Sequence, residues 1–300
     1  MTRWRAAGIH LLLSALLGVC VLALLFFVWY PGPLFRATGG EKLLLLIVGI
    51  DIVAGPLLTL CVYDAKKRLM KLDLAVIGVI QICFLVYGLT TMTVARPAYI
   101  AFVQDRFVVM PANGLSPEDQ ANASDPRYQS VGWTGPEWVF VERPVDPEEK
   151  LEAFNSAMGG KDLEYFPKFY RPYEGHAEDV IRRGWPLTLL QGQNPVWDEW
   201  IGALEQRYGA DQIVFLPLKA KLAEMAVIVD KQSAKPLEYL EINPWPAILT
   251  ELAKRAEAET AAAADSEEPQ GSDSAGAAPM GDGEMAVPEA DSDEESDPQV

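Results

Sequence analysis

Three long runs of apolar residues in the first third of the chain constrain its fold more than any other feature. They cover residues 9–30, 43–63 and 74–94, and the first run contains no Asp, Glu, Lys or Arg. A helix of about 20 residues, rising 1.5 Å per residue, crosses the hydrocarbon core of a bilayer, which is roughly 30 Å thick. The pattern therefore predicts a membrane protein with three transmembrane helices in region 1–96.

The first run could instead be a cleaved signal peptide, because Arg3 and Arg5 form a basic segment ahead of it. Its length and its end argue against cleavage. The run closes on Trp29, Tyr30 and Pro31 rather than on the small residues of a cleavage site. Trp and Tyr are typical of the membrane–water interface, so we favour an uncleaved helix.

Basic residues predict the orientation of the three helices. Two arginines precede the first run, and the loop between the second and third runs holds Lys66, Lys67, Arg68 and Lys71. Positively charged loops stay in the cytoplasm, so we expect the N-terminus and this loop on that side. Everything after Arg96 is then expected outside, which in a bacterial inner membrane means the periplasm.

Asp51 is the unusual residue of the second run. A charge near the middle of a span costs roughly 3 kcal/mol, so this carboxyl group needs an explanation. One hypothesis is a proton-handling or catalytic group. The other, which we favour, is a hydrogen-bonded residue that packs helices together or recognises a partner, because no second aspartate lies at the same depth. Gln81 and Tyr87 of the third run are the nearest candidates for its partner.

The residues around Asp51 favour close helix packing. Gly49 and Gly55 permit close approach of a second helix. Pro56 has no N–H and loosens the helix there, which frees a backbone carbonyl from its usual donor.

From Pro97 to residue 250 the pattern changes to short runs separated by turns, which predicts a small α+β domain outside the membrane. Strands are expected over 98–103, 107–110, 138–141, 213–218, 225–229 and 237–242. Asp146 and Asn194 are each followed by proline, which is typical of a helix start; Leu151, Phe154 and Met158 form the apolar face of the first of these helices. A weaker helix is expected over 177–183, and a loop over 113–129.

An aromatic segment at residues 165–173 stands out in this domain, with Tyr165, Phe169, Tyr170 and Arg171 among its members. We favour the interpretation that these rings cap the core beneath an irregular segment. The alternative is an exposed surface for a protein partner, because aromatic residues and Arg dominate interface hot spots.

Charge, cysteine and histidine usage exclude several classes of function. Residues 257–297 hold 14 of the 42 acidic residues and no Lys or Arg, so the rest of the chain is close to neutral. No basic stripe is present for nucleic acid. All three cysteines lie inside the apolar runs, and His10 and His176 are the only histidines. We therefore expect no catalytic, cofactor-binding or metal-binding residues.

The last region, 251–300, is expected to begin as a frayed helix that reaches about residue 264 and to continue as a disordered acidic tail. Its later part is Ala, Gly, Ser, Pro, Asp and Glu with almost no apolar anchors. Such a composition buries too little apolar surface to offset the entropy of ordering.

Several segments together resemble one known family. They are Gly-Ile-His-Leu-Leu at 8–12, Trp-Tyr-Pro-Gly-Pro-Leu-Phe at 29–35, the Asp51 segment at 48–60, Lys-Leu-Asp-Leu-Ala-Val-Ile at 71–77, Phe-Val-Gln-Asp-Arg-Phe at 102–107 and Asn-Pro-Trp at 243–245. Over about residues 1–246, and most specifically in its apolar half, the chain resembles the TfpX/TfpZ family of type IV pilin accessory proteins.

The resemblance implies a non-enzymatic inner-membrane protein that affects pilus assembly or the balance of extension and retraction. Its implied partners are the lipid bilayer and the major type IV pilin, a single membrane helix with a buried acidic residue and an outer head. We hypothesise that Asp51, Gln81 and the Gly49 and Gly55 face contact the pilin stem, and that the outer domain contacts the head. A membrane enzyme or a proton-coupled transporter component that uses Asp51 is the alternative.

Overall fold

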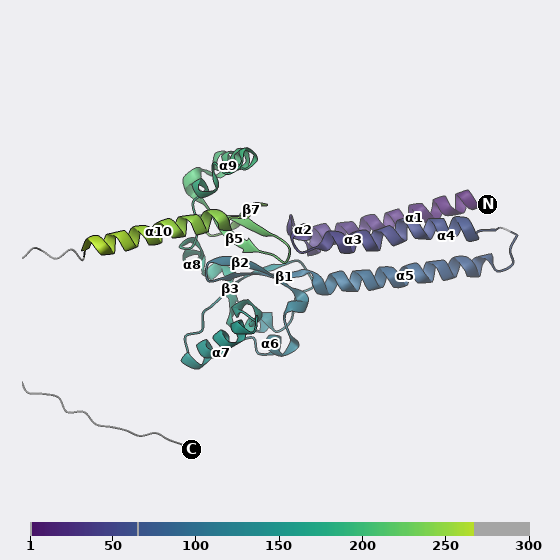
Figure 1. The fold of residues 1–300 in the computed structure, drawn as a ribbon. Coiled ribbons are helices and arrows are strands. Elements are labelled where there is room, and N and C mark those ends of the chain that lie inside the picture. The colour runs from purple at the N-terminus through teal and green to yellow at the C-terminus, as the bar shows by residue number, and fades with distance from the viewer. Residues whose placement is uncertain (1, 65, 267–300) are drawn as a thin grey trace, which may run out of the picture. The chain divides into compact units, whose positions relative to one another are not determined.

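The computed structural model describes residues 2–64 and 66–266, which form an apolar helical bundle followed by an α+β domain (Figure 1). Met1–Ala253 form one compact unit, and a second begins at Lys254. The predicted acidic tail lies outside the described residues from position 267 onward.

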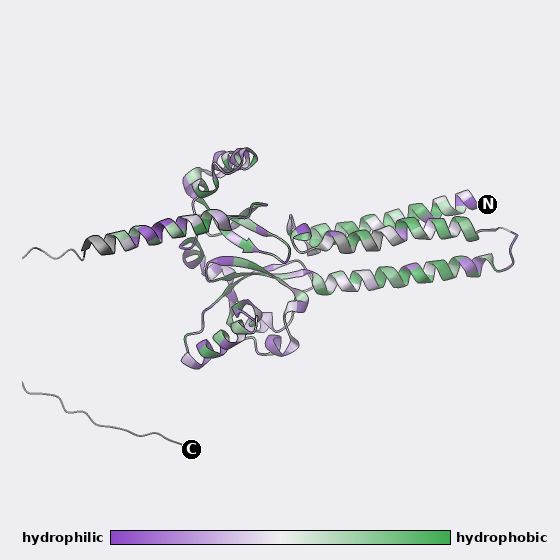
Figure 2. Cartoon of the chain, in the orientation of Figure 1, coloured by the Kyte–Doolittle hydropathy of each residue, from purple (hydrophilic) through white to green (hydrophobic). Residues whose placement is uncertain are grey.

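The bundle consists of apolar helices joined by short connections. Its elements are α1 (Arg3–Leu24), the π-helix η1 (Leu25–Trp29), α2 (Leu34–Ala37), α3 (Gly40–Gly49), the π-helix η2 (Ile50–Ala54), α4 (Gly55–Val62) and α5 (Met70–Ala95). In Figure 2 the hydrophobic colour dominates the long helices of the bundle, in contrast to the mixed colouring of the α+β domain.

Two of these helices are long and apolar enough to cross a membrane, Arg3–Trp29 and Met70–Ala95. Only 22% of the most apolar stretch of the first and 11% of that of the second is buried within the protein. A core helix of a soluble protein would be mostly buried, so the low burial of these two helices favours an apolar environment around them. Sequence analysis predicted three such helices. The second run is helical from Gly40 to Val62 in three pieces, of which Asp51–Val62 qualifies only as a shorter apolar helix.

The α+β domain, which we call the outer domain after its predicted location, is built on one mixed sheet of seven strands in the order β4-β3-β1-β2-β5-β6-β7. The strands are β1 (Pro97–Val103), β2 (Arg106–Pro111), β3 (Glu137–Val141), β4 (Tyr170–Pro172), β5 (Ile213–Lys219), β6 (Glu224–Asp230) and β7 (Pro236–Leu240). β1 and β2 form the predicted hairpin, whose turn places Gln104 at φ 58°. β3 pairs in parallel with β1, and β5 pairs in parallel with β2.

Helices cover the sheet and connect its strands. They are α6 (Pro117–Ala121), α7 (Pro147–Met158), α8 (Ala177–Ile181), α9 (Pro195–Tyr208) and α10 (Trp245–Ser266). Short 3-10 turns complete the connections: η3 (Ala112–Gly114), η4 (Pro126–Tyr128), η5 (Leu163–Tyr165), η6 (Pro167–Phe169), η7 (Tyr173–Gly175), η8 (Leu187–Leu190) and η9 (Ala210–Gln212).

The structure corrects two details of the predicted elements. The expected loop at 113–129 contains α6, because the Ser116 side chain accepts a hydrogen bond from the Asp119 N–H and caps it. The apolar face of α7 is not part of the core. Its residues Leu151, Phe154 and Met158 are 61–78% exposed.

Both faces of the sheet are buried, because its central strands carry apolar residues at successive positions. Ile100 and Phe102 point into the cluster on one face, and Tyr99 and Ala101 into a cluster on the other. A third cluster under β5 and β6 receives residues of α9 and α10, among them Ile201.

The bundle and the outer domain are joined by packing as well as by the chain. Leu34 and Ala37 of the short helix α2 are buried in the same cluster as Ile100. The Leu222 N–H donates to the Ala37 carbonyl at 2.8 Å, between α2 and the turn after β5. The Trp29 indole N–H donates to the Trp133 carbonyl at 3.1 Å. The bundle and the outer domain therefore share buried side chains and hydrogen bonds.

Candidate functional site

Polar side chains gather inside the apolar bundle around Asp51. Asp51 is only 8% exposed, Ser14 on α1 lines the same small cavity, and Thr59 on α4 is also buried in the bundle. His10 Nδ1 and Thr59 Oγ1 form a 2.6 Å hydrogen bond that joins residues 49 positions apart. Sequence analysis did not connect His10 with this group, because only the packing of α1 against α4 brings the two together.

Gln81, one of the two partners predicted for the Asp51 carboxyl group, forms a hydrogen bond with the backbone of that residue. The Gln81 side-chain amide on α5 donates to the Asp51 backbone carbonyl at 3.2 Å. In a π-helical turn each carbonyl pairs with the N–H five residues onward, and for Asp51 that residue is Pro56, which has none. The carbonyl freed by the π-turn η2 and Pro56 is thus satisfied by Gln81 from a neighbouring helix.

The two glycines near Asp51 differ in their surroundings. A Cβ atom on Gly55 would lie 2.1 Å from Gln81 Nε2, so a larger residue there would displace the Gln81 amide from the Asp51 carbonyl. A Cβ on Gly49 would meet nothing within 4 Å. Gly49 therefore does not serve the packing of this chain, and it is exposed. Tyr87 is 67% exposed and is not the partner of Asp51.

One oxygen of the Asp51 carboxyl group has no hydrogen-bond partner among the described residues. It borders a cavity of about 10 Å³ that Ser14 and Gly18 of α1 also line. Such a cavity holds at most about one water molecule. The cavity beside Asp51 is therefore too small for a substrate molecule.

The aromatic segment of the outer domain belongs mainly to the core. Phe169 and Tyr170 are buried, and the Tyr170 ring lies 5.3 Å from Tyr99. Tyr165 is half-buried against the same cluster. Arg171 is also half-buried, and its guanidinium forms a 2.8 Å ion pair with Glu142. These four predicted positions therefore pack the core or its edge.

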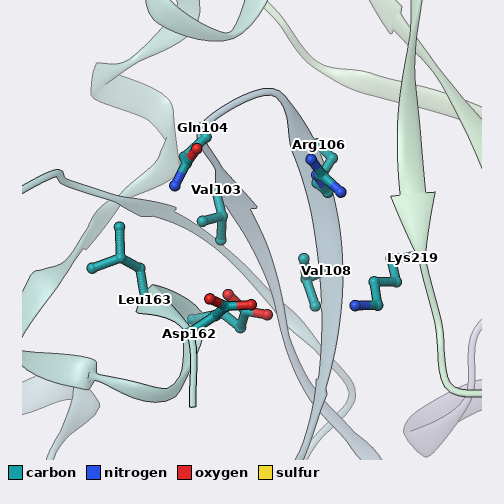
Figure 3. A pocket seen from close by; sticks show the side chains of 8 residues that line it. Val103, Gln104, Arg106, Val108, Asp162, Leu163 and Lys219 are labelled. Carbon is teal, nitrogen blue, oxygen red and sulfur yellow. The ribbon is translucent and has the colours of Figure 1, made fainter. Parts of the chain in front are cut away.

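A polar hollow of about 230 Å³ lies beside this segment (Figure 3). The Asp162 carboxylate and the Lys219 ammonium point into it from opposite sides. Glu164, which also lines the hollow, is only 6% exposed. Burial raises the pKa of the Glu164 carboxyl group, and the nearby Lys219 and Arg106 oppose that shift.

Sequence analysis missed Glu164 as a functional candidate. Its only signal was an acidic residue directly before the aromatic segment. Among the described residues no group of three or more His, Cys, Asp or Glu side chains could hold a metal ion.

These features define a class of protein: apolar helices of membrane-spanning length that carry, and share a core with, an α+β domain. Comparison with known proteins gives the family. The chain is 30% identical over 233 residues to the fimbrial assembly protein of serogroup I of Dichelobacter nodosus, an alignment that covers 76% of this chain and 90% of that relative. It belongs to the family of fimbrial assembly proteins.

Three further matches agree with this assignment. The serogroup E1 fimbrial assembly protein of the same organism is 29% identical over 233 residues, with the same coverage. The protein of serogroups C1 and C2 is 38% identical over 108 residues, 35% of this chain and 82% of that relative. Residues 1–39 match the family model described as fimbrial assembly protein FimB. No solved structure matches the chain.

Proposed function

We propose that this protein is a non-enzymatic inner-membrane accessory of type IV pilus assembly, of the TfpX/TfpZ kind, and that it engages the major pilin. The observation that carries the proposal is the alignment with a fimbrial assembly protein over 90% of that relative's length, which at 76% of this chain is too long to lie in the bundle alone. A role that this protein shares with its relative would use both the bundle and the outer domain.

The proposal includes three membrane spans, with the N-terminus in the cytoplasm and the outer domain in the periplasm. The segment from Gly40 to Val62 is helical throughout, and 23 helical residues extend about 34 Å, enough for a bilayer core. The basic loop after α4 and the arginines before α1 support this orientation.

The junction at α2 supports engagement of a partner that has both a membrane part and an outer part. Because Leu34 is buried in the core of the outer domain, the bundle and the domain share packed residues. A single pilin subunit, with its stem in the bilayer and its head outside, could contact both. Exposed Gly49 on α3 offers a surface where a second helix can approach closely.

A non-catalytic role agrees with the closed site at Asp51, which has room for about one water molecule. The alternative is proton or peptide chemistry at Asp51. It is supported by the carboxyl oxygen that has no hydrogen-bond partner among the described residues. Asp51→Asn separates the two, because it keeps the shape of the side chain and removes its ionisation.

The test is complementation of a deletion strain, with surface pili counted and twitching measured. We expect deletion to change piliation and both wild-type protein and Asp51→Asn to restore it. Unchanged piliation in the deletion strain would contradict the accessory role. Loss of function in Asp51→Asn, at normal protein level and with normal contact to the pilin, would favour the chemical alternative.

A further inference from the structure

A second hollow lies at the carboxyl ends of the parallel strands β1 and β3, and α8 forms its third side. Its volume is about 360 Å³. β1 begins at Pro97, directly after α5 ends at Ala95. The hollow therefore lies at the end of β1 that is farther from the bundle.

The hollow contains more positive than negative charge. Arg143, Arg182 and Arg183 line it, together with the carboxylates of Glu142 and Asp179. Both carboxylates are engaged: Glu142 pairs with Arg171, which lies outside the lining, and Asp179 pairs with Arg182.

Arg143 and Arg183 form no ion pair with any residue in the described part of the chain. Both side chains are exposed. The guanidinium groups of Arg143 and Arg183 thus line the hollow without an ion-pair partner among the described residues.

The floor of the hollow is a stack of flat rings. His176 stacks on Phe140 with ring centroids 3.9 Å apart and planes 4° apart, and Phe140 stacks on Phe102 at 5.8 Å. Gln104, at the hairpin turn, adds an amide to the rim. A carboxylate-bearing side chain could lay its methylene groups on this floor while its oxygens meet the arginines.

We propose that this arginine hollow binds an acidic segment of a protein partner outside the membrane; this rests on the proposed function, in which the partner is a pilus subunit. Planar guanidinium groups recognise carboxylates in bidentate pairs. Anionic lipid of the same bilayer is a poor fit. The seven residues of β1 separate the hollow from the end of α5 by about 23 Å, and charge interactions in the cell are screened beyond about 8 Å.

The experiment uses the full-length protein in detergent micelles, with fluorescein-labelled hexaglutamate as the probe and fluorescence anisotropy as the readout, at about 150 mM salt. The test variant is the double substitution Arg143→Gln and Arg183→Gln. The matched control is Lys231→Gln and Lys235→Gln, which removes the same charge from exposed residues at the turn after β6.

We expect the arginine variant to bind the peptide about ten-fold more weakly or worse, the loss of about 1.4 kcal/mol or more of charge-assisted hydrogen bonding. The lysine control should bind like wild type. Equal weakening in both variants, or no binding by wild type, overturns the proposal.

Inorganic phosphate serves as competitor at the same concentration as the peptide. Displacement by phosphate would make the hollow a site for small oxyanions and would also overturn the proposal. Because the readout is binding by purified protein, its failure is distinguishable from failure of the piliation experiment, which tests the role of the whole chain.

Discussion

The side-chain amide of Gln81 on α5 donates a hydrogen bond to the backbone carbonyl of Asp51 at 3.2 Å, across two apolar helices. This carbonyl has no usual donor because Pro56 follows at the position that a π-turn would use. The contact therefore ties a local irregularity in one helix to a specific residue of another.

Removing this donor should weaken the bundle. Gln81→Leu leaves the Asp51 carbonyl unsatisfied in an apolar interior, which costs about 1–3 kcal/mol. We expect a lower free energy of unfolding in detergent, measured by titration with sodium dodecyl sulfate. Cys83→Ala, at an exposed position two residues along the same helix, is the control and should change little. Equal stability of Gln81→Leu and wild type would argue against the contact.

Substitution by alanine should change the free energy of unfolding in opposite directions at the two glycines near Asp51. At Gly55 a Cβ would lie 2.1 Å from Gln81 Nε2, and the overpacking should cost about 1–3 kcal/mol. At Gly49 a Cβ meets nothing within 4 Å, so alanine should stabilise the helix by up to about 1 kcal/mol. The free energy of unfolding of each variant is measured by the same titration with sodium dodecyl sulfate. A comparable loss at both positions would show that the packing of α4 on α5 is not as described.

Truncation of Leu34 should destabilise the outer domain, although this residue lies between two apolar helices of the bundle. Leu34 is fully buried in the sheet's core, and Leu→Ala at such sites costs about 2–5 kcal/mol. Limited proteolysis within residues 97–253 should become faster. Leu12→Ala, on an exposed face of α1, is the control. An unchanged digestion rate for Leu34→Ala would mean that the two parts are independent.

Glu164 lines the hollow in Figure 3, and its burial predicts that the stability of the protein depends on pH. Because burial raises the pKa of Glu164, the folded protein binds this proton more readily than the unfolded chain does. Stability is therefore lost as the pH rises from the unfolded pKa, about 4.3, through the higher folded value.

Glu164→Gln removes this ionisation, so the variant should gain stability over wild type at pH 7.5 and much less at pH 4.5. The thermal midpoint should shift by about 2–4 °C for each kcal/mol gained. Glu118→Gln, at an exposed carboxylate, should show no such change with pH. A Glu164→Gln difference that is the same at both pH values would refute the explanation.

Local signals predicted much of the fold. The Asp146 side chain accepts hydrogen bonds from the N–H groups of Glu148 and Glu149 at 2.9 and 3.1 Å, as the cap predicted for α7 requires. Asn194 caps α9 in the same way. Runs of β-prone apolar residues placed six of the seven strands, because a strand that is buried on both faces carries apolar side chains at successive positions. The three-residue strand β4 lies in the aromatic segment and was missed.

Relationships between distant segments could not be predicted in this way. The burial of Leu34 under a sheet that begins 63 residues later, and the pairing of His10 with Thr59, depend on tertiary packing that no local pattern encodes. The same reason explains why the arginine hollow was missed. Arg143 and Arg183 line one hollow only because the end of β3 lies beside α8.

The most direct test of the account is site-specific photo-crosslinking in living cells. A photoreactive residue would replace Leu45, which is 78% exposed on the same side of α3 as Gly49, or Val145, which is 80% exposed two residues after Arg143. The account predicts adducts with the major pilin from both positions. Normal protein levels without pilin adducts at either position would contradict it.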